Sequence, residues 1–196
     1  MFKMKSLYER FQEDYVAVRT PCGNKDGFKI EYAYYSPWFV WNLPEDELKK
    51  KKRAILLQGI ASLLVYVLTA CVPCWLNAAG MVSYPALASM IFLCLELFGI
   101  GQFWFARYRT TRFTYEDVHR RLRVYPLLNL VSSSIAAAAC VWYMGAWGFS
   151  RAGVLVTLGY GAEAVLSGRI HSQYRKIPFT TEKNDTLRKV EPVFSK

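Results

Sequence analysis

The sequence predicts an all-α membrane protein with four transmembrane helices, arranged as two tandem hairpin repeats, and a small cytoplasmic N-terminal segment that contains a β-hairpin. Four apolar stretches each supply the roughly 20 residues that a helix needs to cross a bilayer. Of the 25 Lys and Arg residues, only Arg151 lies outside residues 1–53, 106–123 and 169–196. Because positive charge is retained on the cytoplasmic side of a membrane, this distribution predicts that both termini are cytoplasmic.

Residues 1–48 form the predicted cytoplasmic head. Two segments rich in Val, Ile and Tyr, Asp14–Thr20 and Phe28–Tyr35, flank a cluster of Pro, Gly, Asn and Asp residues. This pattern predicts a β-hairpin with a long loop. Since an isolated two-stranded hairpin is marginally stable in water, we expect it to lie against the membrane face or another subunit. Aromatic residues of the head and of the later cytoplasmic segments are candidates for partner contacts: Tyr34, Trp38, Trp41, Phe113 and Phe179.

Residues 49–113 form the first predicted transmembrane hairpin, followed by a basic elbow. Pro44 and the three acidic residues after it favour a helix start, and we expect this helix to cross the membrane over residues 54–72. A short neutral loop begins at Pro73, and the second predicted crossing covers residues 84–105.

Residues 114–176 form the second predicted hairpin. The stretch 114–117 (Thr-Tyr-Glu-Asp) is a candidate N-terminal cap for its first helix. We expect membrane crossings over residues 124–144 and 152–174, and a polar, mostly solvated tail over residues 177–196.

Recurring motifs indicate that the chain is a tandem duplication. The motif Phe-Thr-x-Glu at Phe113 recurs 66 residues later at Phe179, and a Glu followed by Gly five residues on occurs at both Glu96 and Glu163. Each repeat unit would contain two crossings, so both copies keep the same orientation. Their pseudo-symmetry axis is therefore expected to run along the membrane normal.

Glu96 and Glu163 are the only acidic residues in the four predicted crossings. A charged side chain there costs about 3 kcal/mol on insertion scales, so both are expected to face the bundle interior or water. The repeat also matches Gln58 with Asn129, and we predict that these four side chains form an intramembrane polar layer. The layer could bind a proton, a cation or a small substrate, or it could join the helices by hydrogen bonds.

Cys71 and Cys74, at the outer end of the first crossing, are a possible redox pair. A CxxC motif at a helix end is typical of thiol–disulfide exchange sites, although membrane thiol oxidases need a second exposed pair that this sequence lacks. Cys also packs as a small apolar residue, so a structural role is the alternative.

Small residues at regular spacing line the last predicted crossing. Such spacing lets helix backbones approach closely, and we expect it to pack this helix against the third crossing or against another subunit. The residues concerned are Gly153, Thr157, Gly161, Ala164 and Gly168.

The net charge of +10 is explained by juxtamembrane Lys and Arg, which also attract anionic lipid, and we expect no nucleic-acid partner. His119 and His171 have no companion ligands at metal-binding spacing, and the sequence has no nucleotide-binding glycine loop. We therefore predict neither a metal nor a cofactor. The expected partners are the bilayer, other membrane subunits or a second copy of the chain, and the expected location is a bacterial plasma membrane.

Three functions follow from these patterns. The lack of a catalytic constellation favours a non-enzymatic subunit, scaffold or immunity-type membrane component that recruits partners through its aromatic cytoplasmic segments. Glu96 and Glu163 favour a small transporter or channel component, which would need to oligomerise because four helices seldom enclose a pathway alone. Cys71 and Cys74 favour a membrane thiol–disulfide redox protein.

The predicted orientation can be tested by labelling intact cells. An epitope tag at either terminus should bind antibody only after the membrane is permeabilised, because the basic segments hold both ends inside. A single cysteine placed at Trp147, in an otherwise cysteine-free chain, should react with an impermeant maleimide. Labelling of either terminal tag from outside intact cells would contradict the orientation.

Overall fold

The computed structural model describes residues 14–21 and 28–184, and these residues are mostly helical. The loop between the first two strands, which contains Cys22, and the last part of the tail lie outside the described residues. In chain order the elements are β1 (Tyr15–Pro21), β2 (Phe28–Tyr34), β3 (Trp38–Trp41), α2 (Glu45–Cys71), the 3-10 helix η1 (Trp75–Ala78), α3 (Gly80–Phe105), β4 (Arg109–Thr110), α4 (Arg112–Trp147), α5 (Arg151–Arg175) and β5 (Phe179–Glu182).

The chain divides into two compact units. The strand unit comprises Met1–Asn42, Arg107–Glu116 and Phe179–Lys196, and the helical unit comprises Leu43–Ala106 and Asp117–Pro178. Residues from the predicted head, elbow and tail thus belong to one unit, although they are distant in the sequence.

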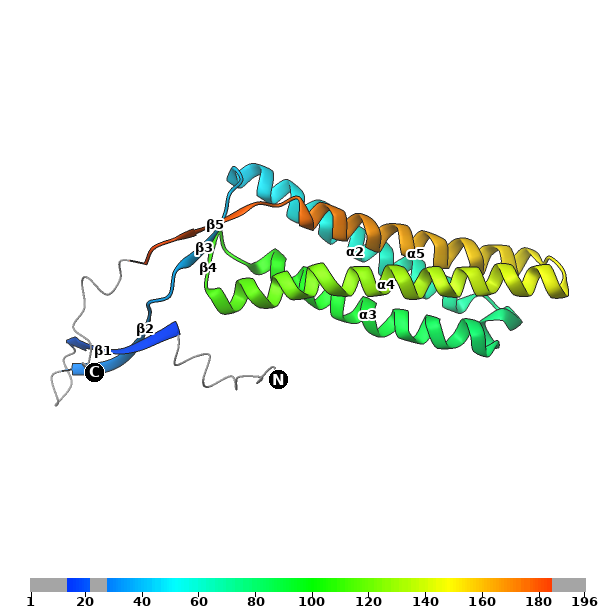
Figure 1. Cartoon of the computed structure of the whole chain (residues 1–196), viewed down its shortest axis with the longest axis horizontal. Helices are drawn as coiled ribbons and strands as arrows, with labels where there is room; N and C mark the ends of the chain where they lie inside the picture. The colour runs from blue at the N-terminus through cyan, green and yellow to red at the C-terminus, as the bar shows by residue number, and fades with distance from the viewer. Residues whose placement is uncertain (1–13, 22–27, 185–196) are drawn as a thin grey trace, which may run out of the picture. The chain divides into compact units, whose positions relative to one another are not determined.

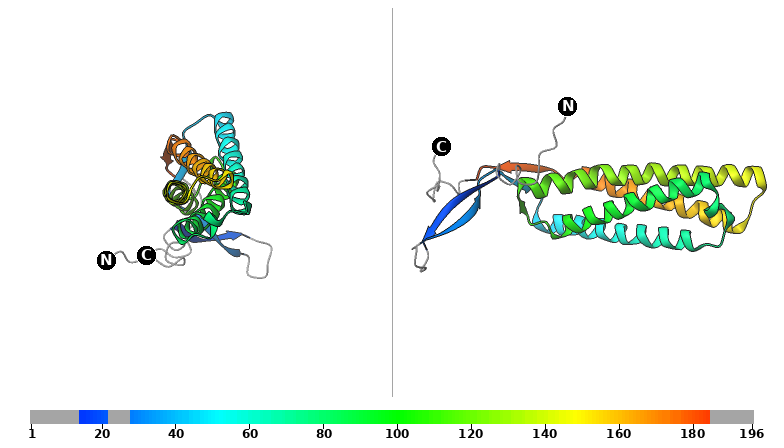
Figure 2. Two further views of the ribbon diagram at one scale, coloured as in Figure 1. Left: turned by 90° about the vertical axis from the view of Figure 1, so that its right-hand side faces the viewer. Right: turned by 90° about the horizontal axis from the view of Figure 1, so that it is seen from below.

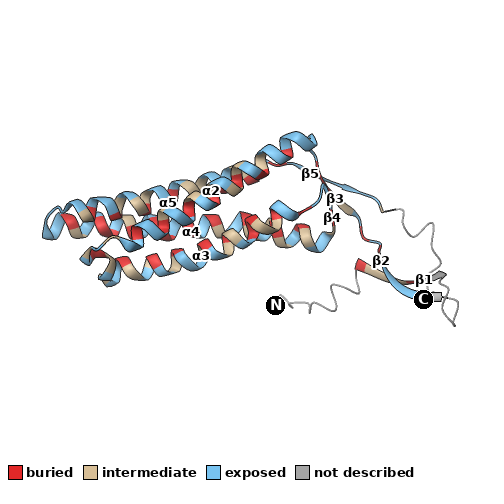
Figure 3. Ribbon diagram, turned by 180° about the vertical axis from the view of Figure 1, so that it is seen from behind, coloured by how far each residue is buried: buried red, intermediate tan, exposed pale blue. Residues whose placement is uncertain are grey.

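Four long helices lie side by side in the helical unit, with neighbours in the sequence running in opposite directions (Figures 1 and 2). The buried residues form stripes along the helices, and the exposed faces carry many large apolar side chains (Figure 3). Helices α2, α3 and α4 are each long and apolar enough to cross a membrane. An apolar exterior of this kind is stable when lipid rather than water surrounds it.

Helix α5 has 25 residues, which is long enough to cross a membrane. Its composition, however, does not meet the criterion that α2, α3 and α4 meet. Its Gly, Ser, Thr and Tyr residues and Glu163 lower its mean hydropathy. The structure therefore supports three apolar helices of membrane length, and the fourth crossing stays a prediction.

Local capping explains where α4 and α5 begin. The Thr111 hydroxyl accepts a hydrogen bond from the Thr114 amide (3.4 Å), so α4 starts about one turn before the predicted cap at residues 114–117. At α5, the Ser150 hydroxyl accepts from the Gly153 amide (3.0 Å). Such caps satisfy amide groups that have no partner within the helix.

The strand unit contains the predicted hairpin and a second, unpredicted sheet. Strands β1 and β2 pair antiparallel from Tyr15 opposite Tyr34 to Pro21 opposite Phe28, which confirms the hairpin. The second sheet has the order β4-β3-β5, with both outer strands antiparallel to β3. Strand β5 lies in the segment predicted to be a solvated tail, and its pairing with β3 orders this part of the tail.

The two copies of Phe-Thr-x-Glu differ in secondary structure, since Phe113 lies in α4 and Phe179 in β5. A different correspondence appears in the sheet. Val40 of β3 is opposite both Arg109 of β4 and Thr180 of β5. This spacing of 71 residues is also the spacing that relates Gln58 to Asn129.

The glycines of the predicted small-residue stripe on α5 differ in their surroundings. A Cβ at Gly153 would be 2.9 Å from Met144 Sδ, and one at Gly168 would be 2.7 Å from Leu130 Cδ1, so both glycines lie against α4. A Cβ at Gly161 would meet nothing within 4 Å.

Helix α5 approaches α2 closely at Gly159, which is outside the predicted stripe. A Cβ at this position would overlap the side chain of Thr69 on α2. The Thr69 hydroxyl donates to Val65 O (2.7 Å), so the overlapping side chain is held in place. Gly159 is therefore required by packing between these two helices.

Alanine substitutions at two nearby glycines test this packing. Gly159→Ala should lower the stability of the detergent-solubilised protein by about 1–3 kcal/mol, because an overpacked contact forces the helices apart. Gly161→Ala, with open space around it, should leave stability unchanged or raise it by up to about 1 kcal/mol. Thermal unfolding followed by circular dichroism would measure both, and equal effects would contradict the assigned contact.

Candidate functional site: a buried carboxyl pair

A cluster of polar side chains occupies the interior of the helical unit and receives members from all four long helices. We call it the polar cluster. Every member is buried with 0% exposure: Ser62 on α2, Ser89 and Glu96 on α3, Asn129 and Ser133 on α4, and Glu163 and Ser167 on α5.

The Asn129 side-chain amide is the centre of the polar cluster. Its Nδ2 lies 3.2 Å from Glu96 Oε2, 2.9 Å from Glu163 Oε1 and 2.8 Å from Ser167 Oγ. An amide nitrogen carries two hydrogens, so three acceptors compete for two donors. Because one nitrogen contacts an oxygen of each carboxyl, the carboxyls lie within two hydrogen-bond lengths of each other.

Serine hydroxyls complete the cluster on both sides of the amide. Ser62 donates to Glu163 Oε1 (2.8 Å), and Ser167 donates to Glu96 Oε2 (3.1 Å). The amide oxygen of Asn129 accepts from Ser89 (2.6 Å) and Ser133 (3.3 Å). The cluster thus links side chains of all four helices through one connected set of hydrogen bonds.

Each carboxyl also has one oxygen without a partner. Glu96 Oε1 and Glu163 Oε2 are buried and have no hydrogen-bond partner among the residues that the structure describes. In residues 14–21 and 28–184, no ion pair joins Lys, Arg or His to either carboxyl. Two buried carboxyls without a countercharge cannot both carry a negative charge without a large desolvation cost. Neutralisation of at least one carboxyl, by a proton or a bound cation, removes this cost.

Three of the four residues of the predicted polar layer meet in the cluster, and Gln58 does not. No hydrogen bond of Gln58 accompanies those of the cluster, and its Oε1 is buried without a partner. Ser62, one turn further along α2, contacts Glu163 instead. An Asn reaches less far than a Gln, so residues matched by the repeat need not make the same contacts.

The four serines of the cluster were not predicted from the sequence. A signal was present, because Ser133 follows Asn129 and Ser167 follows Glu163 by four residues, which places each pair on one helix face. Ser62 and Ser133 also differ by the same 71 residues as Gln58 and Asn129. A serine is common on membrane helices, and only its neighbours across the bundle give it this role.

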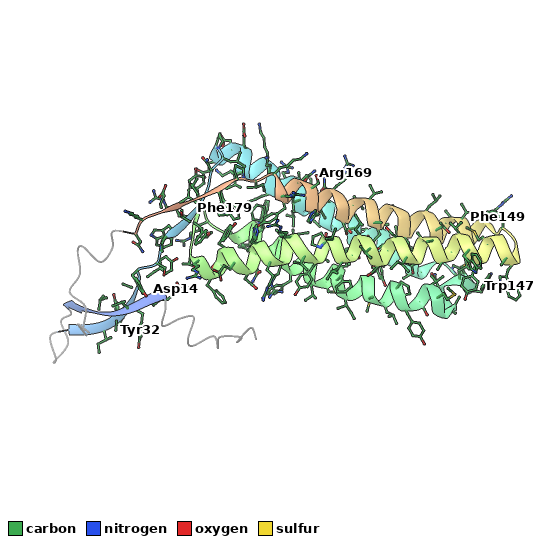
Figure 4. The ribbon with its side chains drawn as sticks, in the orientation of Figure 1. Asp14, Tyr32, Trp147, Phe149, Arg169 and Phe179 are labelled. Atoms are coloured by element: carbon green, nitrogen blue, oxygen red, sulfur yellow. The ribbon has the colours of Figure 1, made fainter. Side chains whose placement is uncertain are left out.

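The polar cluster lies along α5 between two differently composed ends. Figure 4 shows Trp147 and Phe149 at the turn between α4 and α5, and Arg169 toward the opposite end of α5. Glu163 lies between them in the sequence, closer to Arg169. Glu163 is the middle residue of α5 (Arg151–Arg175), and Asn129 is close to the middle of α4 (Arg112–Trp147), so the cluster lies near mid-length of these helices.

The cysteines and histidines do not form a comparable site in the described part of the chain. Cys71 is exposed, Cys74 is half-buried, and both are free thiols. Ring nitrogens of His119 lie 3.5 Å from the Tyr174 hydroxyl and 3.3 Å from Arg123. Among the described residues, no group of three or more His, Cys, Asp or Glu could hold a metal ion.

The residues predicted to face partners have different environments. Trp41 (2% exposed) and Tyr34 (8%) are buried, whereas Phe113 and Phe179 are more than 40% exposed. The Tyr34 hydroxyl donates to Pro37 O (2.8 Å) and accepts from the Arg112 amide (2.8 Å). Burial raises the pKa of this phenol, so it stays protonated and can donate. Trp38, also predicted to face a partner, is half-buried and packs against the Tyr34 ring (4.6 Å between centroids).

Tyr115, which was not predicted, is the centre of an aromatic cluster in the strand unit. Its ring is stacked on Phe39, with 4.5 Å between centroids and 11° between planes. It also contacts Phe179 (4.6 Å) and Trp41 (5.7 Å). These contacts join side chains of β3, β5 and the start of α4.

Comparison of the chain with protein-family models, with curated proteins and with solved structures found no match. The polar cluster and the membrane-length helices are therefore the basis for a functional proposal.

Substitution of matched residues tests the central position of Asn129. Asn129→Leu should lower the free energy of unfolding in detergent by about 3 kcal/mol, because it leaves two carboxyls and several hydroxyls without donors. Gln58→Leu, its counterpart in the repeat, should change stability by less than about 1 kcal/mol, since its buried oxygen has no partner to lose. A larger loss for Gln58→Leu would contradict the assigned cluster.

Proposed function

We propose that the chain is an integral membrane protein with four crossings, and that its buried carboxyl pair is the ion-binding centre of a small transporter or channel component. The observation that carries this proposal is the pair itself: each carboxyl has one unpartnered oxygen, and no cationic side chain among the described residues is bonded to either. Intramembrane acidic residues mark ion and proton pathways when they face a bundle interior.

A purely structural role explains the site less well. Amides and hydroxyls alone join membrane helices by hydrogen bonds, and Asn129 with Ser89 and Ser133 already does so. A second buried carboxyl, when ionised, adds desolvation cost without adding a donor. A subunit or scaffold protein would have no use for that cost, whereas an ion-binding site requires it.

Several features support four crossings with both termini inside. The turn between α4 and α5 is only residues 148–150, so α5 must return along the bundle from the far end of α4. Basic residues cluster near the starts of α2 and α4 and the end of α5, as the positive-inside rule requires. The matching positions of β4 and β5 opposite β3 support two tandem units. Four helices seldom enclose a pathway, so we propose a homo-oligomer or a complex with other membrane subunits.

Ion flux through reconstituted vesicles tests this function. Vesicles that contain the full chain should dissipate an imposed membrane potential faster than empty vesicles. Glu96→Gln and Glu163→Gln should each reduce this rate by about a hundredfold, the effect typical of losing an essential proton-transfer group. The matched control is Glu47→Gln on the exposed first turn of α2, which should conduct as the wild type does.

A different result would favour the scaffold interpretation. If wild-type vesicles show no flux above empty vesicles, or if Glu96→Gln and Glu163→Gln alter only stability, the carboxyl pair is not an ion-binding centre. Changes at the exposed Phe113 and Phe179 would then be the next test, because a scaffold should lose a co-purifying partner.

A further inference from the structure

The donors around the carboxyl pair indicate which ion it binds. All contacts that the cluster makes with the bonded oxygens are donations: Ser62 and Asn129 to Glu163 Oε1, and Asn129 and Ser167 to Glu96 Oε2. The neighbouring groups therefore present hydrogens to the carboxyls. A metal cation would need lone pairs from these groups instead.

The oxygens that could face a cation are too few. Calcium takes six to eight oxygen ligands and magnesium six, but only Glu96 Oε1 and Glu163 Oε2 are unpartnered in the cluster. The amide oxygen of Asn129 already accepts from Ser89 and Ser133. Rotation of the amide to offer its oxygen would turn its NH2 group toward two serine hydroxyls and leave both carboxyls without their shared donor.

A proton makes no such demand, because it needs one carboxyl oxygen. Two carboxyls this close disfavour double ionisation, so one proton between them is the simplest neutralisation. The titratable neighbour of Glu163 on α2 is Tyr66, whose hydroxyl donates to Ala86 O (2.9 Å). The cluster members on α4 are an amide and a hydroxyl, and neither titrates, so no nearby base competes for the proton.

We infer that the ion bound by Glu96 and Glu163 is a proton, held as an O–H bond on one of their two unpartnered oxygens. This inference rests on the proposed function and specifies its ion. Binding forms one O–H bond and removes one negative charge, and release to water reverses both changes. Asn129 positions the pair by donating to both carboxyls in either state.

Infrared spectroscopy of the full chain in lipid tests proton binding without any transport assay. A C=O band of a protonated carboxyl should be present at neutral pH, shift in D2O, and weaken in Glu96→Gln and in Glu163→Gln. Addition of Na⁺ or K⁺ at constant pH should leave the wild-type band unchanged. Absence of the band, or its loss on adding Na⁺ or K⁺, would overturn the inference. The wild-type result decides this even if a variant fails to fold.

Ion replacement in the vesicle assay separates the two proposals. With a trapped pH indicator, a proton gradient should drive flux that falls about a hundredfold in Glu96→Gln, while Na⁺ and K⁺ gradients alone should drive none. Flux that depends on the glutamates but is carried by Na⁺ or K⁺ would overturn the proton inference and leave the proposed function standing. A carboxyl band without any flux would support proton binding and contradict the transport function.

Discussion

The packing of the helical unit is constrained by its buried polar side chains, which need hydrogen-bond partners inside an apolar bundle. Asn129 meets this need for several side chains at once, because its amide has both donors and an acceptor and all of them are used. A buried polar group without a partner is costly in an apolar interior, so these groups find partners on other helices. The positions of α3, α4 and α5 around Asn129 follow from this constraint, and Ser62 extends it to α2.

The strand unit is built from segments that alternate with the long helices in the sequence. Strand β3 is followed by α2 after three residues, β4 lies between α3 and α4, and β5 follows α5 after three residues. Tyr115 and its aromatic neighbours stabilise the sheet by packing as well as by hydrogen bonds.

Stability and function make opposite demands on the polar cluster. Hydrogen bonds from Asn129 and the serines would be complete with neutral partners, yet two carboxyls are present, and each leaves an oxygen unpartnered. A protein that only needed to hold helices together would lose nothing by replacing one of them with an amide. An unpartnered buried oxygen is costly, and the bound proton that we propose explains why it is retained.

The sequence by itself determined the apolar helices, the hairpin and the unusual status of Glu96 and Glu163, because length, periodicity and buried charge are local or compositional signals. It did not determine strands β4 and β5, which are too short for a periodic pattern and exist only by pairing with β3. It also grouped Gln58 with Asn129 in one polar layer, whereas the bundle uses Ser62, and it did not single out Gly159, which packs against α2. Such contacts depend on the rotation of each helix against its neighbours, and only the tertiary structure decides that rotation.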